Sequence, residues 1–287
     1  MWYYKLIVGV TTAFLLWQTP CHASQPPMDA MIPDNPLVFG VVPQQSPRKL
    51  ARKWVPLIRH LAQQTGLRIQ FQTAPDIPTF EKRLAEGRYD LAYMNPYHYT
   101  VFHKKPGYRA IAREHGKYLR GVIVVAKDSP YQRPEDLEGK SMVFPSPAAF
   151  AASLLTQAYL KNLGVSVQPQ YVYSHDSVYQ SVGRELSEAG GGIQRTLNNS
   201  DSVVREQLRV LLSTDGYSSH AFAIHPRVPH ALATQLQAAL VGLVQTLDGK
   251  TLLKQMNMHQ LEQAKDADWD DVRELDIHLL DSLIEGS

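Results

Sequence analysis

The chain has 287 residues, a length that allows two lobes or one large α/β domain. With 44% apolar and 20% charged residues and no repeat or low-complexity tract, its composition is that of a soluble globular protein and excludes a disordered one. The 29 Lys and Arg residues against 27 Asp and Glu give a formal charge of +2, and they are spread along the chain, so nothing indicates a nucleic-acid partner.

The N-terminus has the layout of a secretory signal peptide over residues 1–23. Lys5 precedes an unbroken apolar run at 6–17, and the small residues Cys21 and Ala23 place the expected cleavage after Ala23. The apolar run would rise only about 18 Å as a helix, which is too short for a membrane core of roughly 30 Å. A membrane anchor is therefore disfavoured, and a lipidated Cys21 is a second alternative.

Cys21 is the only cysteine of the chain, so cleavage would leave a mature protein with none. Disulfides, cysteine nucleophiles and thiolate metal sites would be absent with it. No other apolar run approaches membrane-spanning length. We therefore expect a soluble mature protein in the bacterial periplasm, with no membrane span.

A flexible leader at 24–36, rich in Pro and polar residues, is expected before a first lobe at 37–118. Alternating strand and helix patterns in this lobe favour a parallel sheet covered by helices. The expected elements are strands at 37–43, 67–74 and 89–94, a helix from Ser46 to Gly66, a short helix capped by Thr79, and a helix to about Lys104 capped by Asn95.

A second, inserted lobe is expected at 119–225, followed by C-terminal helices at 226–287 that return to the first lobe. Its expected strands are 121–127, 141–145, 208–214 and 220–226. Its expected helices are 146–164, starting at Ser146-Pro147, and one within 171–190, capped by Ser174 or Asp176. A glycine turn is expected at 190–192, and the C-terminal helices at 229–248 and 267–284.

The catalytic and nucleotide-binding motifs with the sharpest signatures are absent from the sequence: GxSxG, GxxxxGK[ST], GxGxxG and HExxH. His98 and His103 lack a third ligand at helical spacing, so an exposed helix face is favoured over a metal site. His175 and Asp176 could act as a base and its orienting carboxylate, or could belong to a helix cap and a polar loop. We expect no catalytic residue, metal or cofactor.

One local pattern recurs four times, at 43–48, 94–97, 145–147 and 174–177: a strand, then Pro or a capping residue, then a helix. Each such junction exposes helix N–H groups and the positive end of a helix dipole, which together favour an oxyanion. Tyr93, Tyr97, Tyr99 and His175 lie near these junctions. The pattern indicates a cleft that closes on a small anion or zwitterion.

The stretch AGGGIQRT at 189–196 offers two interpretations. Consecutive glycines could turn their N–H groups inward as an anion nest, with Arg195 as a bidentate clamp. The alternative is a tight turn between helix and strand, with a surface arginine.

Residues 36–245 resemble the PhnD-like phosphate, phosphite and phosphonate-binding components of ABC importers. The resemblance is carried by FGVVPQQSP (39–47), YDLAYMNPYHY (89–99), VVAKDSPYQRPEDLEGKSMVFPSPAAFAAS (124–153) and YSHDSVYQSV (173–182). It implies an α/β fold of the two-lobed type II periplasmic binding-protein kind, with lobes joined by a hinge and the ligand cleft between them. The implied ligand-binding residues are Gln44, Gln45, Tyr93, Asn95, Tyr97, Ser146 and His175, to which we add Asp176 and Arg195.

The sequence departs from this family at the start of the second-lobe helix. Relatives that bind phosphonate have a run of Ser and Thr hydroxyls there, whereas this chain has Ser146 followed by Pro147, Ala148 and Ala149. Each lost hydrogen bond to a charged group costs about 1.5–3 kcal/mol, so phosphonate binding would be much weaker without replacement contacts. Gly190–Gly192 and Arg195 are the expected replacements.

The leading hypothesis is a periplasmic solute-binding component of an ABC importer, which binds a small anionic or zwitterionic solute of the phosphonate, phosphate or phosphite type by lobe closure. It would be no enzyme, and its partner would be an inner-membrane permease. The alternative is a ligand-sensing module that feeds a membrane histidine kinase. A hydrolase using His175 is a third possibility, although no nucleophile motif accompanies the histidine.

Overall fold

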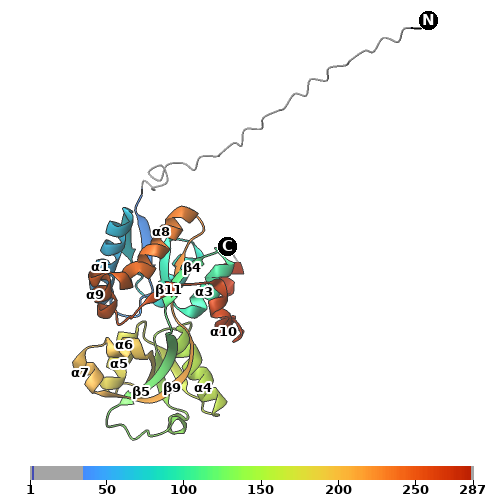
Figure 1. Ribbon diagram of the computed structural model, residues 1–287. Coiled ribbons are helices and arrows are strands. Elements are labelled where there is room, and N and C mark those ends of the chain that lie inside the picture. The colour runs from blue at the N-terminus through green and yellow to red at the C-terminus, as the bar shows by residue number, and fades with distance from the viewer. Residues whose placement is uncertain (1, 3–34, 286–287) are drawn as a thin grey trace. The chain divides into compact units, whose positions relative to one another are not determined.

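The computed structural model describes Trp2 and residues 35–285. The predicted signal peptide, its cleavage site and almost all of the predicted leader lie outside the described residues. Within that described part, no helix combines the length and the apolar character needed to cross a membrane. Residues 35–285 form two lobes, each built on its own β-sheet (Figure 1).

The first lobe contains a mixed sheet of six strands in the order β11-β4-β10-β3-β1-β2. The predicted parallel arrangement is confirmed for β1, which pairs in parallel with both β2 and β3. β10 and β11 run antiparallel to their neighbours, and β4 and β11 were not predicted from the sequence. The strands are β1 (Leu37–Val41), β2 (Ile69–Gln72), β3 (Leu91–Met94), β4 (Arg109–Glu114), β10 (Ala221–Ile224) and β11 (Leu261–Gln263).

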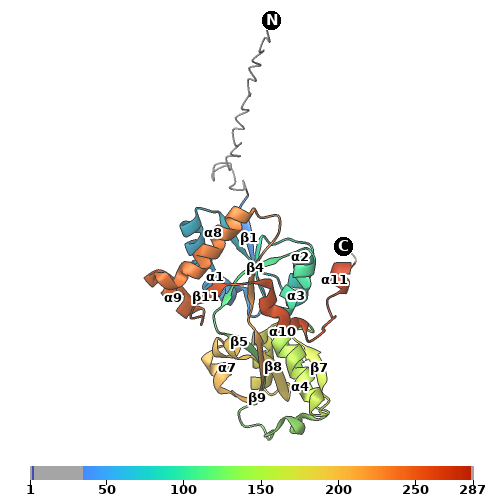
Figure 2. The same cartoon turned by 45° about the vertical axis from the view of Figure 1, so that its right-hand side comes forward.

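Helices cover both faces of this sheet (Figures 1 and 2). α1, α8 and α9 pack together on one face, and α2 and α3 lie on the other. The predicted helix at 267–284 is instead the short 3₁₀ helix η5 (Asp266–Trp269) followed directly by α10, with α11 after a non-helical stretch. The helices are α1 (Pro47–Thr65), α2 (Ile77–Ala85), α3 (Pro96–Lys104), α8 (His230–Val241), α9 (Leu247–Gln255), α10 (Asp270–Arg273) and α11 (Ser282–Glu285).

The starts of the first three helices follow from local capping. Asn95 caps α3 as predicted, because its side chain accepts a hydrogen bond from the His98 backbone N–H at 2.7 Å. The predicted cap Thr79 is wrong: Asp76 caps α2, and its carboxylate accepts from the Thr79 N–H. α1 begins at Pro47, as predicted, and ends at Gly66, which adopts the left-handed conformation.

The second lobe contains a sheet of five strands in the order β7-β6-β8-β5-β9. β6 pairs in parallel with β7 and β8, whereas β5 runs antiparallel to β8 and β9. α5, α6 and α7 lie on one side of this sheet and α4 on the other (Figure 1). The elements are β5 (Tyr118–Ala126), β6 (Ser141–Phe144), β7 (Gln168–Tyr171), β8 (Ala189–Ile193), β9 (Leu208–Ser218), the short η2 (Pro134–Leu137), the π-helix η3 (Phe150–Leu155), α4 (Thr156–Asn162), α5 (His175–Gly183), α6 (Gln194–Asn198) and α7 (Ser202–Glu206).

The chain crosses between the lobes twice, from β4 to β5 and from β9 to β10. β5 and β9 pair with each other up to the crossing points, which makes a two-segment hinge (Figures 1 and 2). The strand expected at 220–226 was assigned to the second lobe, but β10 is hydrogen-bonded between β3 and β4 in the first sheet. The inserted lobe therefore ends before Ala221. The sequence pattern predicted a strand here, but the sheet that the strand joins depends on its pairing with β3 and β4.

Two predictions for the second lobe, a helix start and a turn, are wrong. The helix expected to begin at Ser146-Pro147 begins at Phe150, because residues 146–149 form a turn in which the Ser146 carbonyl accepts from the Ala149 N–H and the Ser153 hydroxyl. The glycine turn expected at 190–192 is the middle of strand β8. Ser174, one of the two predicted caps, does cap α5 by accepting from the Ser177 N–H.

The glycines of β8 are required by packing. A Cβ atom on Gly191 would lie 2.0 Å from the Ala152 carbonyl oxygen, and one on Gly192 would lie 2.3 Å from the Tyr179 hydroxyl. η3 and α5 therefore approach the strand more closely than any side chain on it would allow. The stretch forms neither of the two predicted features, the anion nest or the tight turn; its glycines allow the helices to contact the sheet.

Candidate functional site

The two lobes meet along the loops that follow β1 and β3 and precede α5 and η3, and backbone and side-chain hydrogen bonds join them directly. The His175 N–H of the second lobe donates to the Gln44 carbonyl at 3.0 Å. Asn95 Nδ2 of the first lobe donates to the Ala148 carbonyl at 3.3 Å. The apolar core of the first lobe continues into the second through Phe150 and Ile193. The structure is therefore a closed arrangement of the lobes.

Asp176 makes the first of two charged contacts across the cleft. Its carboxylate accepts from Gln45 Nε2 at 3.3 Å and from the Ser46 N–H at 3.4 Å, and it lies 3.2 Å from Lys49 Nζ. Ser46 and Lys49 belong to the amino end of α1, one of the junctions predicted to favour an oxyanion. A carboxylate from the opposite lobe thus occupies this anion-favouring position.

Arg195 makes the second contact, from α6 to the first lobe. Its guanidinium forms an ion pair with Glu114, at the end of β4, and donates to the Tyr93 hydroxyl at 3.0 Å. Glu114 is only 4% exposed, and burial raises the pKa of Tyr93 to about 12. We call the contact of Arg195 with Glu114 and Tyr93 the latch. Neither interpretation drawn from the sequence, nest clamp or surface arginine, describes it.

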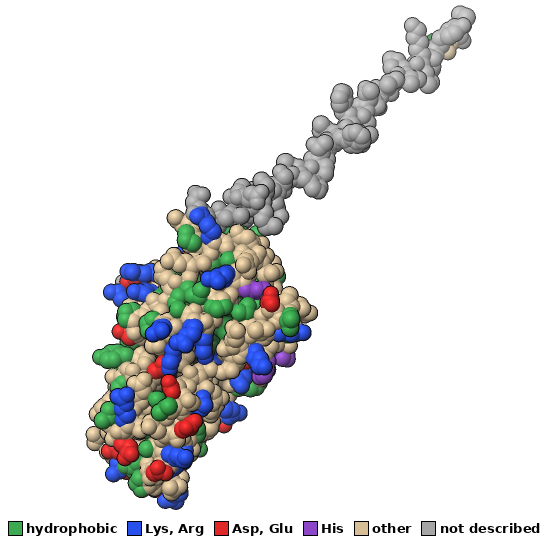
Figure 3. Space-filling model, turned by 90° about the vertical axis from the view of Figure 1, so that its left-hand side faces the viewer, with side chains coloured by type: hydrophobic (Ala, Val, Ile, Leu, Met, Phe, Trp, Pro, Cys, Tyr) green, Lys and Arg blue, Asp and Glu red, His purple; other side chains and the backbone are tan. Residues whose placement is uncertain are grey.

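Positive charge surrounds these contacts. Lys and Arg side chains gather at mid-height of the face shown in Figure 3. Burial, followed by the charges of Arg195 and Lys49, lowers the pKa of Lys53 on α1 to about 8. The charges of Arg195 and Lys49 act on Lys53 as well as burial does, so cations gather in this region.

A small cavity lies between the lobes, lined by predicted site residues Gln44, Asn95 and His175. Its volume of about 20 Å³ holds roughly one water molecule. Ala149 and Phe150 line the same space, so the departure noted in the sequence fills the cleft with apolar atoms. The Nδ1 atom of His175 is buried without a hydrogen-bond partner, and burial lowers the pKa of this histidine to about 4.

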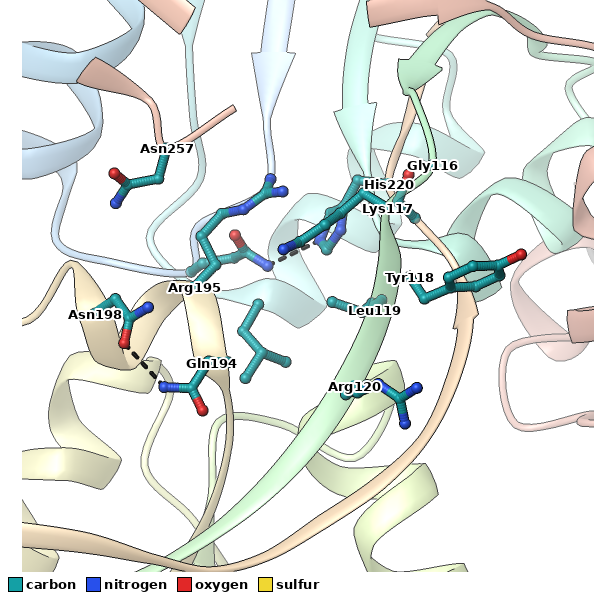
Figure 4. A pocket seen from close by; sticks show the side chains of 13 residues that line it. Gly116, Lys117, Tyr118, Leu119, Arg120, Gln194, Arg195, Asn198, His220 and Asn257 are labelled. Atoms are coloured by element: carbon teal, nitrogen blue, oxygen red, sulfur yellow. Dashed lines mark hydrogen bonds between the residues drawn. The ribbon is translucent and has the colours of Figure 1, made fainter. Parts of the chain in front are cut away.

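A larger pocket opens beside the hinge, with a volume of about 370 Å³. It shares Gln44, Leu119, Ile193 and His220 with the small cavity and also contains Lys117, Arg120, Gln194, Arg195, Asn198, Ser219 and Asn257. Figure 4 shows that these side chains come from both lobes and from both hinge segments. We call it the hinge-side pocket.

Tyr97 does not reach either cavity, so its assignment to the ligand site is wrong. Its side chain is 1% exposed within the first lobe, and its hydroxyl accepts from the Leu280 N–H at 2.9 Å. The first turn of α3 points this ring toward the C-terminal segment, away from the cleft. Tyr93 faces the cleft, but its ring stacks on His220 and its hydroxyl is held by Arg195.

Ser146 is buried, and its hydroxyl has no hydrogen-bond partner; it lines neither cavity. His98 was predicted on an exposed helix face, but it is fully buried, and its Nε2 lies 2.9 Å from Glu81 Oε1. Within residues 35–285, no group of three or more His, Cys, Asp or Glu side chains could hold a metal ion.

Three residues of the site were missed from the sequence: Glu114, Lys117 and His220. Glu114 belongs to the unpredicted strand β4, and Lys117 belongs to the hinge that follows it. His220 is buried against Tyr93, and burial holds its pKa well below the usual value. The sequence signal that could have identified His220 was its position as a polar residue directly before the apolar strand β10.

The stability of the protein is expected to fall as the pH drops from about 6.5 to 4. His175 has a pKa of about 4 in the folded protein, against about 6.5 when unfolded, so within this interval only the unfolded chain binds the proton. The loss reaches about 3 kcal/mol at the acid end. Urea unfolding at several pH values measures it.

The control for this pH dependence is a substitution of an exposed histidine. His175→Gln should flatten the pH dependence in part, because the buried His220 acts in the same direction. His259→Gln, at an exposed position, should leave it unchanged. Equal slopes for wild type and His175→Gln would contradict the assignment.

Comparison with known proteins places the chain in a family. The model of the periplasmic substrate-binding protein of phosphonate ABC transporters matches residues 39–269. The curated phosphate-import protein PhnD of Mycolicibacterium smegmatis is 22% identical over 245 residues, which cover 77% of this chain and 76% of that protein.

Two solved structures share the fold. The binding-protein component of an ABC phosphonate transporter from Pseudomonas aeruginosa has a TM-score of 0.78 at 15% identity, over 85% of this chain and 86% of that one. PhnD1 from Prochlorococcus marinus, solved with methylphosphonate, has a TM-score of 0.77 at 16% identity, over 83% and 96%. The chain therefore belongs to the family of periplasmic substrate-binding proteins of phosphonate ABC transporters, which confirms the two-lobed fold and a role in solute binding in the periplasm rather than in catalysis.

Proposed function

We propose that the protein captures a small anion or zwitterion of the phosphonate, phosphate or phosphite type between its lobes and presents the closed form to an inner-membrane permease. The observation that carries this proposal is the set of cationic and amide side chains from both lobes that converge on the hinge-side pocket. A ligand in contact with both lobes favours the closed arrangement, which a permease can recognise. Removal of residues 1–23 during export is part of the proposal.

Two relatives supply the ligand class. The mycobacterial relative is named for phosphate import, and PhnD1 was solved with methylphosphonate. The family match favours transport over the sensory alternative. Of the predicted residues, Gln44 and Arg195 line the hinge-side pocket and are the proposed contacts, whereas Asn95 and His175 line the small cavity. Gln45 and Asp176 are proposed to act by holding the lobes together.

Ligand binding should raise the melting temperature of the mature protein. A ligand at about 100 times its Kd stabilises the folded form by about 2.7 kcal/mol, which corresponds to roughly 5–10 °C for a protein of this size. Thermal shift measurements with phosphate, phosphite, phosphonates, organic phosphates, sulfonates and amino acids test this. No shift with any member of that panel would contradict the proposal.

A further inference from the structure

The volumes of the two cavities differ in the closed arrangement. The small cavity, about 20 Å³, has room for a water molecule but not for a phosphonate. The hinge-side pocket, about 370 Å³, falls within the range of sites that hold organic ligands considerably larger than a phosphonate. Of these two cavities, only the hinge-side pocket has room for the solute in the closed arrangement.

The charge of the hinge-side pocket indicates an anion. Its lining contains Lys117, Arg120 and Arg195 but no Asp or Glu. Arg195 is neutralised by Glu114, whereas Arg120 keeps its charge but is held against the second lobe by its hydrogen bond to the Thr214 carbonyl. Lys117 is the cation of the lining whose ammonium group makes no ion pair or hydrogen bond within residues 35–285. In Figure 4 its side chain extends toward the middle of the pocket, whereas the Tyr118 ring points the opposite way.

The remaining polar groups indicate a hydroxylated ligand body. The amides of Gln44, Gln194, Asn198 and Asn257 line the pocket; each makes one hydrogen bond to a neighbouring side chain and keeps further donor and acceptor capacity for a hydroxyl group. The Ser219 hydroxyl, buried in the same lining, has no hydrogen-bond partner. Inorganic phosphate or a methylphosphonate would be too small to reach Lys117 and these groups together.

We propose that the solute is a hydroxylated organic phosphate, of the size of a sugar phosphate, bound in the hinge-side pocket with its phosphate group on Lys117. This inference rests on the proposed function and names its ligand class. The pocket is lined by both hinge segments, through Lys117 and Leu119 on one and Ser219 and His220 on the other. A ligand there holds the hinge in the closed arrangement by contacting both segments at once.

Isothermal titration calorimetry with glucose 6-phosphate, methylphosphonate, inorganic phosphate and glucose tests the inference. Glucose 6-phosphate should bind at least 10-fold more tightly than methylphosphonate, and glucose should not bind detectably. Lys117→Gln should weaken glucose 6-phosphate binding by about 10- to 100-fold, the usual effect of losing a hydrogen bond to a charged group. Lys161→Gln, an exposed lysine on α4, is the matched control and should leave the affinity unchanged.

The outcomes separate this inference from the function on which it rests. If methylphosphonate or phosphate binds as tightly as glucose 6-phosphate, or if Lys117→Gln leaves its affinity unchanged, the inference is overturned while the proposed function stands. If no ligand of the thermal shift panel binds, both fail. Circular dichroism of Lys117→Gln establishes that lost affinity is not lost folding, since neither lysine is buried.

Discussion

Arg195→Ala is expected to shift the lobes toward an open arrangement in solution. The substitution removes the latch and leaves the Glu114 carboxylate buried without its counter-ion. An uncompensated buried charge costs about 3–5 kcal/mol. Because Arg195 and Glu114 belong to different lobes, opening returns the carboxylate to water and relieves that cost. The ratio of closed to open molecules should therefore fall by about 100-fold or more.

Small-angle X-ray scattering of the ligand-free protein measures this change as a larger radius of gyration. Arg205→Ala is the matched control, since Arg205 is an arginine of the same lobe that makes no contact with the first lobe in the recorded hydrogen bonds and ion pairs. The double variant Arg195→Ala with Glu114→Gln should close again in part, because no unpaired carboxylate remains. Scattering from Arg195→Ala identical to that of wild type would show that the latch does not hold the lobes.

Gly191→Ala is expected to lower the melting temperature by about 6–12 °C or to prevent folding. Its Cβ atom would lie 2.0 Å from the Ala152 carbonyl oxygen and 2.6 Å from the Phe144 ring. Overpacking of a core costs about 1–3 kcal/mol and occasionally more. The upper end applies here, because the first obstacle is backbone, which cannot rotate away. For a protein of this size, about 3 kcal/mol corresponds to the stated loss.

Gly242→Ala is the control for this substitution. No atom lies within 4 Å of a Cβ at that position, and its φ of −70° suits any residue. It should leave the melting temperature unchanged or raise it slightly, by the equivalent of about 0.4–1 kcal/mol. If Gly191→Ala melted like wild type, the close packing of η3 on β8 would be wrong, and the turn interpretation of the glycines would return.

Features that depend on neighbouring residues were predicted well. The cap at Asn95 and the start of α1 at Pro47 follow from a few adjacent side chains and the fixed φ of proline. The residues Leu50, Trp54, Leu57, Ile58 and Leu61 recur at helical spacing in the sequence, and all five are buried on one face of α1. The turn at Ser146 was missed although the motif was the same, because the hydroxyl of Ser153, seven residues further on, donates to the Ser146 carbonyl.

Features that depend on distant residues were not predicted. Consecutive glycines are typical both of a turn and of a strand against which a helix packs closely. Only their contacts with Ala152 and Tyr179, which belong to other elements, distinguish the two. Tyr97 is an aromatic residue next to a helix cap, where a ligand contact is expected. Its hydroxyl instead accepts a hydrogen bond from the Leu280 N–H. The partner of Arg195 could not be predicted because Glu114 lies on a strand with no clear sequence pattern.

The sequence by itself determined the α/β class, the starts of α1 and α3, and the family whose motifs run through both lobes, because these depend on local propensity and on residue order. Only the tertiary structure decided what the cleft contains. Closure brings Asp176 to the amino end of α1 and Arg195 to Glu114, and it leaves about 370 Å³ of free volume beside the hinge but about 20 Å³ in the small cavity. These contacts join residues separated by 130 and 81 positions, so their energies depend on how the lobes pack and leave no local pattern in the sequence.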